Sequence, residues 1–180
     1  MQLSLNKQSA LRALRAIRCG NTPQVNRPII RMEKAPLRSP QRPDVRKRWS
    51  PAAAHLDWLG MPQPTQRTPL HVAVPSDLSR IRARFFSCTI YSTGLPDDAF
   101  LDIGNGIQIA SPELLFVEFA TVMIPQVLVL LGYELTGKYS RDASSPRLGP
   151  VTYGVPPLTT VEKIEDFMAR CHGIPGLCSA

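Results

Sequence analysis

Arginine is the residue whose type and spacing offer the clearest chemistry in this 180-residue sequence. A guanidinium group presents its donors in a planar fork, which suits it to bidentate recognition of phosphate. Basic residues recur in three groups: at a spacing of three near the start of the chain, side by side at 46–48, and alternating with apolar residues at 80–84. We expect nine side chains to contact nucleic acid: Arg12, Arg15, Arg18, Arg46, Lys47, Arg48, Arg80, Arg82 and Arg84.

The alternation at residues 80–84 has two interpretations. Successive side chains of an extended segment point to opposite sides, so the arginines would share one face and Ile81 and Ala83 the other. The arginine face is then either a β-ribbon that meets phosphate or a solvated sheet edge, which arginine also protects from aggregation. The sequence leaves both interpretations open.

Charge is distributed unevenly along the chain. Residues 1–84 contain 16 Lys and Arg against 4 Asp and Glu, a balance of +12, whereas residues 85–180 contain 5 against 10, a balance of −5. A basic front half suggests nucleic acid, an anionic surface or an acidic protein as its partner. The acidic second half of the same chain is a further candidate for that partner.

No combination of residues predicts catalysis. One carboxylate cluster is present, formed by Asp97, Asp98, Asp102, Glu113 and Glu118, but no lysine follows at the short spacing of a metal-dependent nuclease. The three histidines lie in three different expected elements, and no phosphate-binding glycine loop or nucleophile motif occurs. We therefore expect a non-enzymatic protein with no metal and no cofactor.

Cysteine usage and apolar segments bear on the compartment. Cys19, Cys88, Cys171 and Cys178 have irregular spacings that predict neither a zinc site nor a disulfide framework, so free thiols in the cytoplasm are expected. The most apolar stretch, residues 119–133, is shorter than the roughly 20 residues of a spanning helix, and we expect it to be buried rather than in a membrane. A mitochondrial transit peptide within the basic first 32 residues remains an alternative.

The front of the chain predicts one helix and then an irregular arm. Asn6 can cap a helix from about residue 7 to residue 19, which Gly20 would end. Residues 21–48 combine many prolines with many basic residues, and proline at that density forbids both helix and central strand. A short helix over residues 52–59 is expected to follow.

The remaining residues predict alternating strands and helices. Strands are expected near 70–74, 85–92, 100–103 and 107–110, with Asn105 and Gly106 forming a type I′ hairpin turn between the last two. Helices are expected near 112–123, 125–136 and 160–171, the first capped by Ser111 and the third opened by a capping box at Thr159 and Glu162. Residues 138–158 are expected to be loop.

These elements predict an α+β fold. It consists of a small, mainly antiparallel sheet with a hairpin, packed against three C-terminal helices and preceded by a basic, proline-rich N-terminal arm. We expect two units, a helix and arm over residues 1–48 and an α+β domain over residues 49–178.

The order of several segments resembles the central domain of bacterial AbiEi-type antitoxins and of related proteins that carry a C-terminal Vsr-like endonuclease domain. The segments are Leu70-His-Val-Ala-Val-Pro75, the arginines and strand that follow, Gly94-Leu-Pro96, the hairpin, and the helix that begins at Ser111-Pro-Glu. An uncharacterised subgroup shares similar segments at residues 132–137, 139–142 and 151–157. Its members continue past the residues that match 172–177 into the nuclease domain, which this sequence lacks.

Three hypotheses follow from the resemblance and the charge. The first is a regulatory or interaction domain of antitoxin type that contacts DNA through the basic front half and binds a toxin protein. The second is a truncated front part of a Vsr-like endonuclease with no activity of its own. The third is a scaffold for an acidic protein partner. Truncation would leave the face that the next helix normally covers exposed, so we also expect marginal stability or self-association through that C-terminal face.

Overall fold

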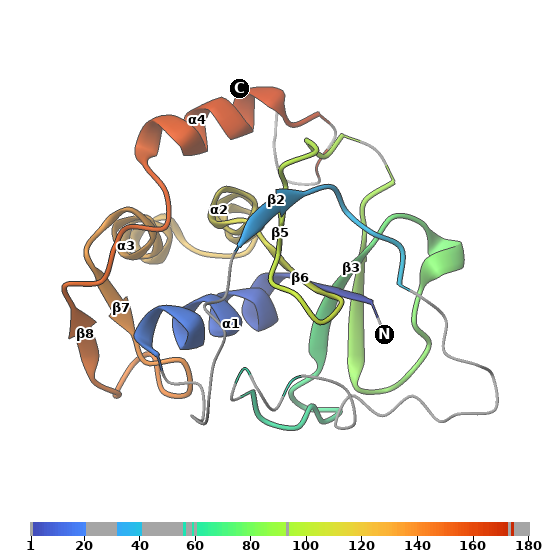
Figure 1. The fold of residues 1–180 in the computed structure, drawn as a ribbon, viewed down its shortest axis with the longest axis horizontal. Coiled ribbons are helices and arrows are strands. Elements are labelled where there is room, and N and C mark those ends of the chain that lie inside the picture. Colours follow the sequence, from blue (N-terminus) through green and yellow to red (C-terminus); the bar gives the residue numbers. More distant parts are fainter. Residues whose placement is uncertain are drawn as a thin grey trace.

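The computed structural model describes residues 2–20, 32–40, 56, 59, 61–92, 94–172 and 174. Its strands are β1 (Leu3–Leu5), β2 (Glu33–Ala35), β3 (Leu70–Val74), β4 (Phe86–Ile90), β5 (Phe100–Asp102), β6 (Ile107–Ala110), β7 (Tyr139–Arg141) and β8 (Val151–Tyr153). Its α-helices are α1 (Lys7–Cys19), α2 (Pro112–Ala120), α3 (Pro125–Thr136) and α4 (Val161–Arg170), with a short 3-10 helix η2 (Asp77–Ser79). The expected α+β class is confirmed (Figure 1).

The main sheet has six strands in the order β2-β5-β6-β1-β3-β4. β1 runs parallel to β6 and antiparallel to β3, and β3 runs parallel to β4. Three of its five strand pairings are antiparallel, so the expected small, mainly antiparallel sheet is confirmed, with two parallel pairings in addition. The hairpin β5–β6 is antiparallel as expected, and the additional parallel pairs arise because β1 inserts beside β6 and the chain crosses over between β3 and β4.

The first residues of the chain belong to the centre of this sheet. Leu3 and Leu5 are buried, and α1 packs against β3, β6 and α2 (Figure 1). A boundary at residue 48 therefore does not separate residues 2–20 from the rest of the fold. β2 is a three-residue strand without proline inside the proline-rich segment, and it pairs only with β5 at the edge of the sheet, so the expectation that this segment forms no central strand still holds for the described residues.

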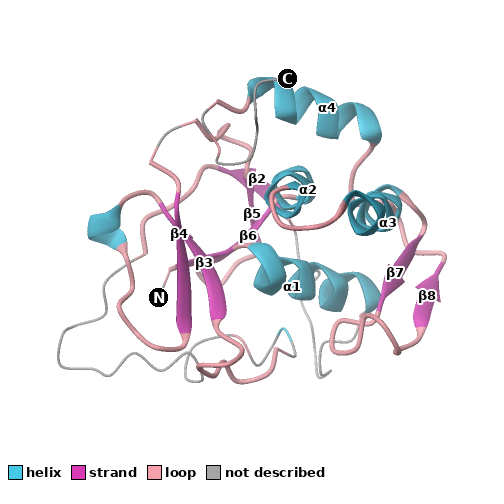
Figure 2. Cartoon of the chain, turned by 180° about the vertical axis from the view of Figure 1, so that it is seen from behind, coloured by secondary structure: helices cyan, strands magenta, loops and turns pink. Residues whose placement is uncertain are grey.

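The four α-helices of the described residues pack in two layers, the first next to the sheet and the second outside it. α1 and α2 lie beside each other, and α3 and α4 pack on the outside of α2 (Figure 2). The small β7–β8 sheet lies against α1 and α3 and occupies part of the expected loop 138–158. The expected helix over residues 52–59 lies largely outside the described residues.

Two turn and cap predictions are confirmed. Asn105 and Gly106 both have positive φ, 52° and 75°, as a type I′ turn requires, and the N–H of Ile107 closes the turn onto the carbonyl of Gly104. Ser111 caps α2, since its hydroxyl accepts a hydrogen bond from the N–H of Leu114.

Two other cap predictions are wrong in detail. The side chain of Asn6 does not cap α1, because its amide donates instead to the carboxylate of Glu118. Thr160 rather than Thr159 caps α4, and the hydroxyl of Thr159 donates to Glu113. In both cases a tertiary contact with α2 takes the side chain that local spacing assigned to a cap.

The apolar stretch at residues 119–133 is only partly buried. Leu128 and Leu131 face the core, but Val122, Val129 and Tyr133 are 71%, 54% and 63% exposed. No helix in the described residues is both long and apolar enough to cross a membrane. One side of α3 is therefore an apolar surface.

Candidate nucleic-acid interface

Arg80, Arg82 and Arg84 form an exposed row, here called the arginine ridge. The ridge lies on the segment between η2 and β4, which ends in a turn at Arg84 and Phe85, and β4 is an edge strand of the main sheet (Figure 2). All three arginines are exposed, whereas Ile81 and Ala83 pack against the core. The alternation expected from the sequence is thus present.

Backbone and side-chain contacts hold the ridge in place. The thiol of Cys88 points at the carbonyl of Ile81 at 3.5 Å, and the N–H of Phe86 donates to the carbonyl of Ala83 at 3.0 Å. Arg80 approaches the exposed Asp77 at 3.8 Å, a distance at which a surface pair contributes little. Arg82 and Arg84 make no ion pair within the described part of the chain, so their charge is available to a partner.

The arginines of α1 have a different role, because their side chains contact the C-terminal half of the chain. Arg15 forms a two-point ion pair with Glu134 on α3, with N–O distances of 2.8 and 2.6 Å. The Arg15 and Glu134 side chains are 11% and 3% exposed, so the pair is nearly buried. Arg12 donates from Nε to the carbonyl of Ala143 at 3.0 Å.

Arg18 binds the C-terminal end of α3. Its guanidinium donates to the carbonyls of Glu134, Gly137 and Pro156. The last carbonyls of a helix lack hydrogen-bond donors within the helix and carry partial negative charge. A cation at this end therefore both donates hydrogen bonds to the carbonyls and offsets their charge. Burial lowers the pKa of Arg18, against the opposing charge of Glu134, and the group stays a cation.

Glu134 is the acidic counterpart of this contact. Burial alone would raise its pKa, but the hydrogen bonds and charge of Arg15, with a smaller contribution from Arg141, outweigh burial and the pKa is lowered. Its Oε1 also accepts from the N–H of Arg141 at 3.0 Å. One carboxylate thus joins α1, α3 and β7.

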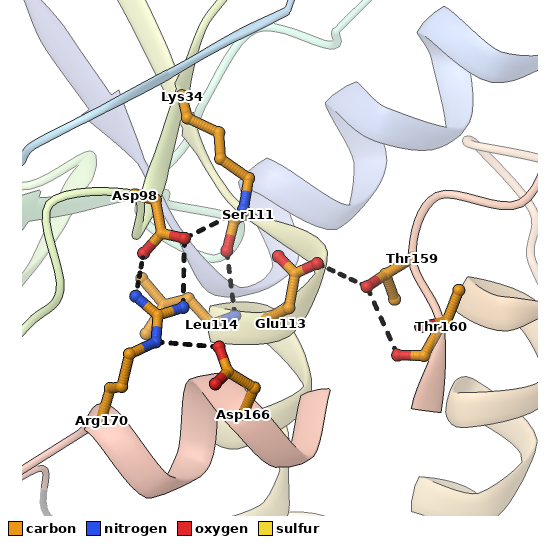
Figure 3. A network of polar contacts seen from close by, with 9 residues as sticks. All are labelled: Lys34, Asp98, Ser111, Glu113, Leu114, Thr159, Thr160, Asp166 and Arg170. Atoms are coloured by element: carbon orange, nitrogen blue, oxygen red, sulfur yellow. Dashed lines mark hydrogen bonds and ion pairs between the residues drawn. The ribbon is translucent and has the colours of Figure 1, made fainter. Parts of the chain in front are cut away.

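The carboxylate cluster expected near residues 97–118 does not converge on one site. Asp98 lies between Lys34 and Arg170, with N–O distances of 2.9 Å to each, and these contacts, with the Arg170 hydrogen bond the largest, lower its pKa to about 2 (Figure 3). Asp102 pairs with Arg38. Within the described residues, no group of three His, Cys, Asp or Glu side chains could hold a metal ion.

Glu118 is buried in a separate network. Its carboxylate accepts hydrogen bonds from the Asn6 amide, the backbone N–H of Lys7 and the hydroxyl of Tyr91. Burial raises its pKa despite these donors. The carboxylate supplies the N-terminal cap of α1 that Asn6 does not, and it holds Lys7 at its positive φ of 45°.

The structure thus divides the nine candidate residues into three sets. Arg80, Arg82 and Arg84 face solvent together, and Arg12, Arg15 and Arg18 make internal contacts. Arg46, Lys47 and Arg48 lie outside the described residues. Sequence reasoning missed Arg67, an exposed arginine beside β3 with no ion pair among the described residues, whose only signal was a lone cation between Pro64 and Pro69.

No protein-family model matches the chain, and no curated protein and no solved structure matches it either. The resemblance to AbiEi-type antitoxins therefore stays a prediction that depends on the order of the quoted segments.

The Arg15–Glu134 pair can be tested by a double-mutant cycle. Arg15→Met leaves a buried carboxylate without its main partner and should lower the free energy of unfolding by roughly 3 kcal/mol. Arg15→Met combined with Glu134→Gln should cost less than Arg15→Met alone, because the uncompensated charge is gone. Urea unfolding at neutral pH measures both.

Arg147→Met is the matched control, since Arg147 is exposed and makes no ion pair among the described residues. Its effect should stay within about 0.5 kcal/mol. Because the folded pKa of Glu134 is lowered, the pair's contribution is present above the ordinary Glu pKa and is lost as pH falls through the folded value. An Arg15→Met effect as small as that of Arg147→Met would refute a stabilising pair.

Proposed function

We propose that this chain is a non-enzymatic regulatory domain of the antitoxin type that contacts DNA through the arginine ridge. The observation that carries the proposal is the exposure of Arg80, Arg82 and Arg84 within five residues beside an edge strand. Extended segments at a sheet edge can follow a phosphate backbone, and guanidinium groups recognise phosphate without reading sequence. The antitoxin type is supported only by the resemblance of the segment order.

Within the basic front half, the proposal assigns the DNA contact to the ridge and not to the arginines of α1. Arg15 and Arg18 are held by α3 and by Pro156, so a DNA phosphate would have to compete with those contacts. Arg12 donates through Nε to Ala143 and lies on α1 rather than on the ridge. Arg82 and Arg84 have no such competitor among the described residues. The ridge is therefore the first surface to test.

Binding through the ridge should be steeply dependent on salt. Each neutralised phosphate of duplex DNA contributes about 0.9 to the slope of log K against log salt, so three arginines give a slope of roughly −2.7. Fluorescence anisotropy with a labelled duplex, titrated between low and physiological salt, measures it. Arg82→Gln with Arg84→Gln should weaken binding at low salt and reduce the steepness by roughly 2.

Arg147→Gln is the control for charge alone, because Arg147 is exposed in the loop between β7 and β8. The β7–β8 sheet lies on the other side of the molecule from β3, which leads toward the ridge segment (Figure 1). The control variant should leave the slope of the ridge contact intact. The proposal fails if the unmodified chain shows no duplex binding at low salt, or if the ridge variant binds as the unmodified chain does.

A second candidate function is protein interaction through α3, and the exposed apolar side of that helix favours it. The surface consists of Val122, Ile124, Val127, Val129, Leu130 and Tyr133, each between 42% and 71% exposed. Together they expose on the order of 600 Å² of apolar side chain, the upper end of the roughly 300–600 Å² seen for the largest patch of a monomer.

We infer that a second copy of this chain covers the α3 surface. No charged residue occurs between positions 119 and 133, so the surface can face itself across a two-fold axis without opposing like charges. Two copies would bury roughly 1,200 Å², the lower limit for a specific interface. Their relation would be isologous, each α3 contacting the other.

Sedimentation velocity over a concentration series tests this interface. The chain should show a reversible monomer–dimer equilibrium at micromolar to millimolar concentrations, and Val129→Asp should shift it toward monomer by burying a charge in the contact. Leu148→Asp places the same charge on a 93% exposed loop residue and should leave the equilibrium unchanged. A chain that stays monomeric throughout, or a Val129→Asp variant that still dimerises equally, excludes the α3 interface.

A further inference from the structure

A cavity of about 300 Å³ lies between α1 and the segment that leads into β3. Gln8, Ser9, Arg12 and Arg15 line it from α1, and residues between Met61 and His71 line it from the facing segment. Ala143 and Pro146, in the loop after β7, close a third side. Neither the ridge nor the α3 surface contributes a residue to this cavity.

The lining of the cavity is cationic. Three arginines, Arg12, Arg15 and Arg67, border it, and none of the described residues that line it is Asp or Glu. The charge of Arg15 is balanced by Glu134. Arg12 and Arg67 make no ion pair in the described part of the chain. The pKa of the Asp142 carboxyl is lowered chiefly by hydrogen bonds within its own loop, and the nearby charge of Arg12 also contributes. Among the described residues, the cavity is therefore bordered by one unpaired positive charge, Arg67, and by a second, Arg12, that interacts with Asp142 without an ion pair.

The stems of two of these arginines are fixed by other contacts. Arg12 is held through Nε by the carbonyl of Ala143, and Arg15 through Nε and Nη2 by Glu134. Both guanidinium groups keep N–H donors that bond to none of the described residues. Donors positioned before a ligand arrives lose little side-chain freedom on binding it.

Hydroxyl groups add further donors. The hydroxyl oxygen of Ser9 accepts the backbone N–H of His71 at 2.8 Å, which leaves its own hydrogen free to be donated. Thr68 also lines the cavity. Burial and the nearby charge of Lys7 lower the pKa of His71, so His71 lines the cavity as a neutral ring at neutral pH.

The remaining wall is apolar. Met61, Leu70 and four prolines at positions 62, 64, 69 and 146 line it, and proline gives a stiff surface without backbone donors. A volume of about 300 Å³ is at the lower end of the range for small-molecule sites, which are mostly apolar with a few placed polar groups. Such a cavity fits an anion that carries a compact organic body.

We propose that this cavity binds a phosphate monoester on a small organic body, of the class of a nucleoside monophosphate. The phosphate meets Arg12 and Arg67, and the organic body lies against the proline wall. The site is separate from the arginine ridge, so it does not rest on the proposed DNA contact.

Isothermal titration of the full chain with adenosine 5′-monophosphate and with adenosine, in a phosphate-free buffer of low salt, tests the site. The monophosphate should bind and adenosine should bind at least tenfold more weakly. Arg67→Gln and Arg12→Gln should each weaken monophosphate binding roughly tenfold or more, as expected for the loss of a hydrogen bond to a charged group. Thermal unfolding of each variant reports whether it is folded.

Lys163→Gln removes a positive charge from the exposed face of α4, away from the cavity, and should leave monophosphate binding unchanged. Short oligonucleotides with a 5′-phosphate or a 5′-hydroxyl distinguish the source of the monoester. A preference for the 5′-phosphate that Arg67→Gln abolishes assigns nucleic-acid ends, and binding of the mononucleotide alone assigns a free nucleotide.

The site is refuted if monophosphate and adenosine bind equally, if neither binds at millimolar concentration, or if a folded Arg67→Gln variant binds as the unmodified chain does. Because no duplex is present in the titration, these outcomes are independent of whether the ridge binds DNA.

Discussion

The buried carboxylate of Glu134 is paired with a cation from the other end of the chain, and much of the structure depends on this pair. Glu134 on α3 is almost completely shielded from solvent, and Arg15 on α1 reaches it with two hydrogen bonds. Arg18, one turn further along α1, binds the carbonyls at the end of α3. These contacts determine where α1 lies, and α1 in turn covers β1, β3 and β6, on which the sheet is centred.

This arrangement explains the uneven charge of the chain. Part of the excess of positive charge in the front half is neutralised by the acidic back half, through Arg15 with Glu134, Lys34 with Asp98 and Arg38 with Asp102. The overall charge of +7 is therefore a poor guide to what faces a partner. Among the described residues the available cations are concentrated in the ridge at 80–84 and around the cavity beside α1. In these two places several cations lie close together, whereas other exposed cations, such as Arg147 and Lys163, lie elsewhere.

Local sequence signals predicted most elements but not their assembly. The hairpin turn at Asn105-Gly106, the cap at Ser111 and the boundaries of α1, α3 and α4 depend on residues within a few positions of one another, and they were predictable for that reason. β1 and β2 are three-residue strands whose stability comes from partners about 70 to 100 residues away, and no short pattern encodes that pairing. The mixed sheet could not be predicted without them.

The candidate sites follow the same rule: what depends on neighbouring residues was predictable, and what depends on distant segments was not. The alternation at 80–84 predicted which side chains are exposed, because neighbouring side chains of an extended segment point to opposite sides. The helical spacing of Arg12, Arg15 and Arg18 is equally compatible with a solvated face and with an internal contact, and only the position of α3 decides between them. The cavity was not predictable, since its lining comes from three separate segments and Arg67 stands alone in its own.

The central claim is that the first residues of the chain are part of the sheet rather than of an appended arm. Amide hydrogen exchange of the intact protein tests it most directly, by comparing residues 2–6 with β6. We predict that the amides of β1 that are hydrogen-bonded in the sheet, including Leu3 to the carbonyl of Gly106, exchange as slowly as those of β6 and lose protection together with them. Residues 2–6 that exchange orders of magnitude faster than β6 would contradict this account.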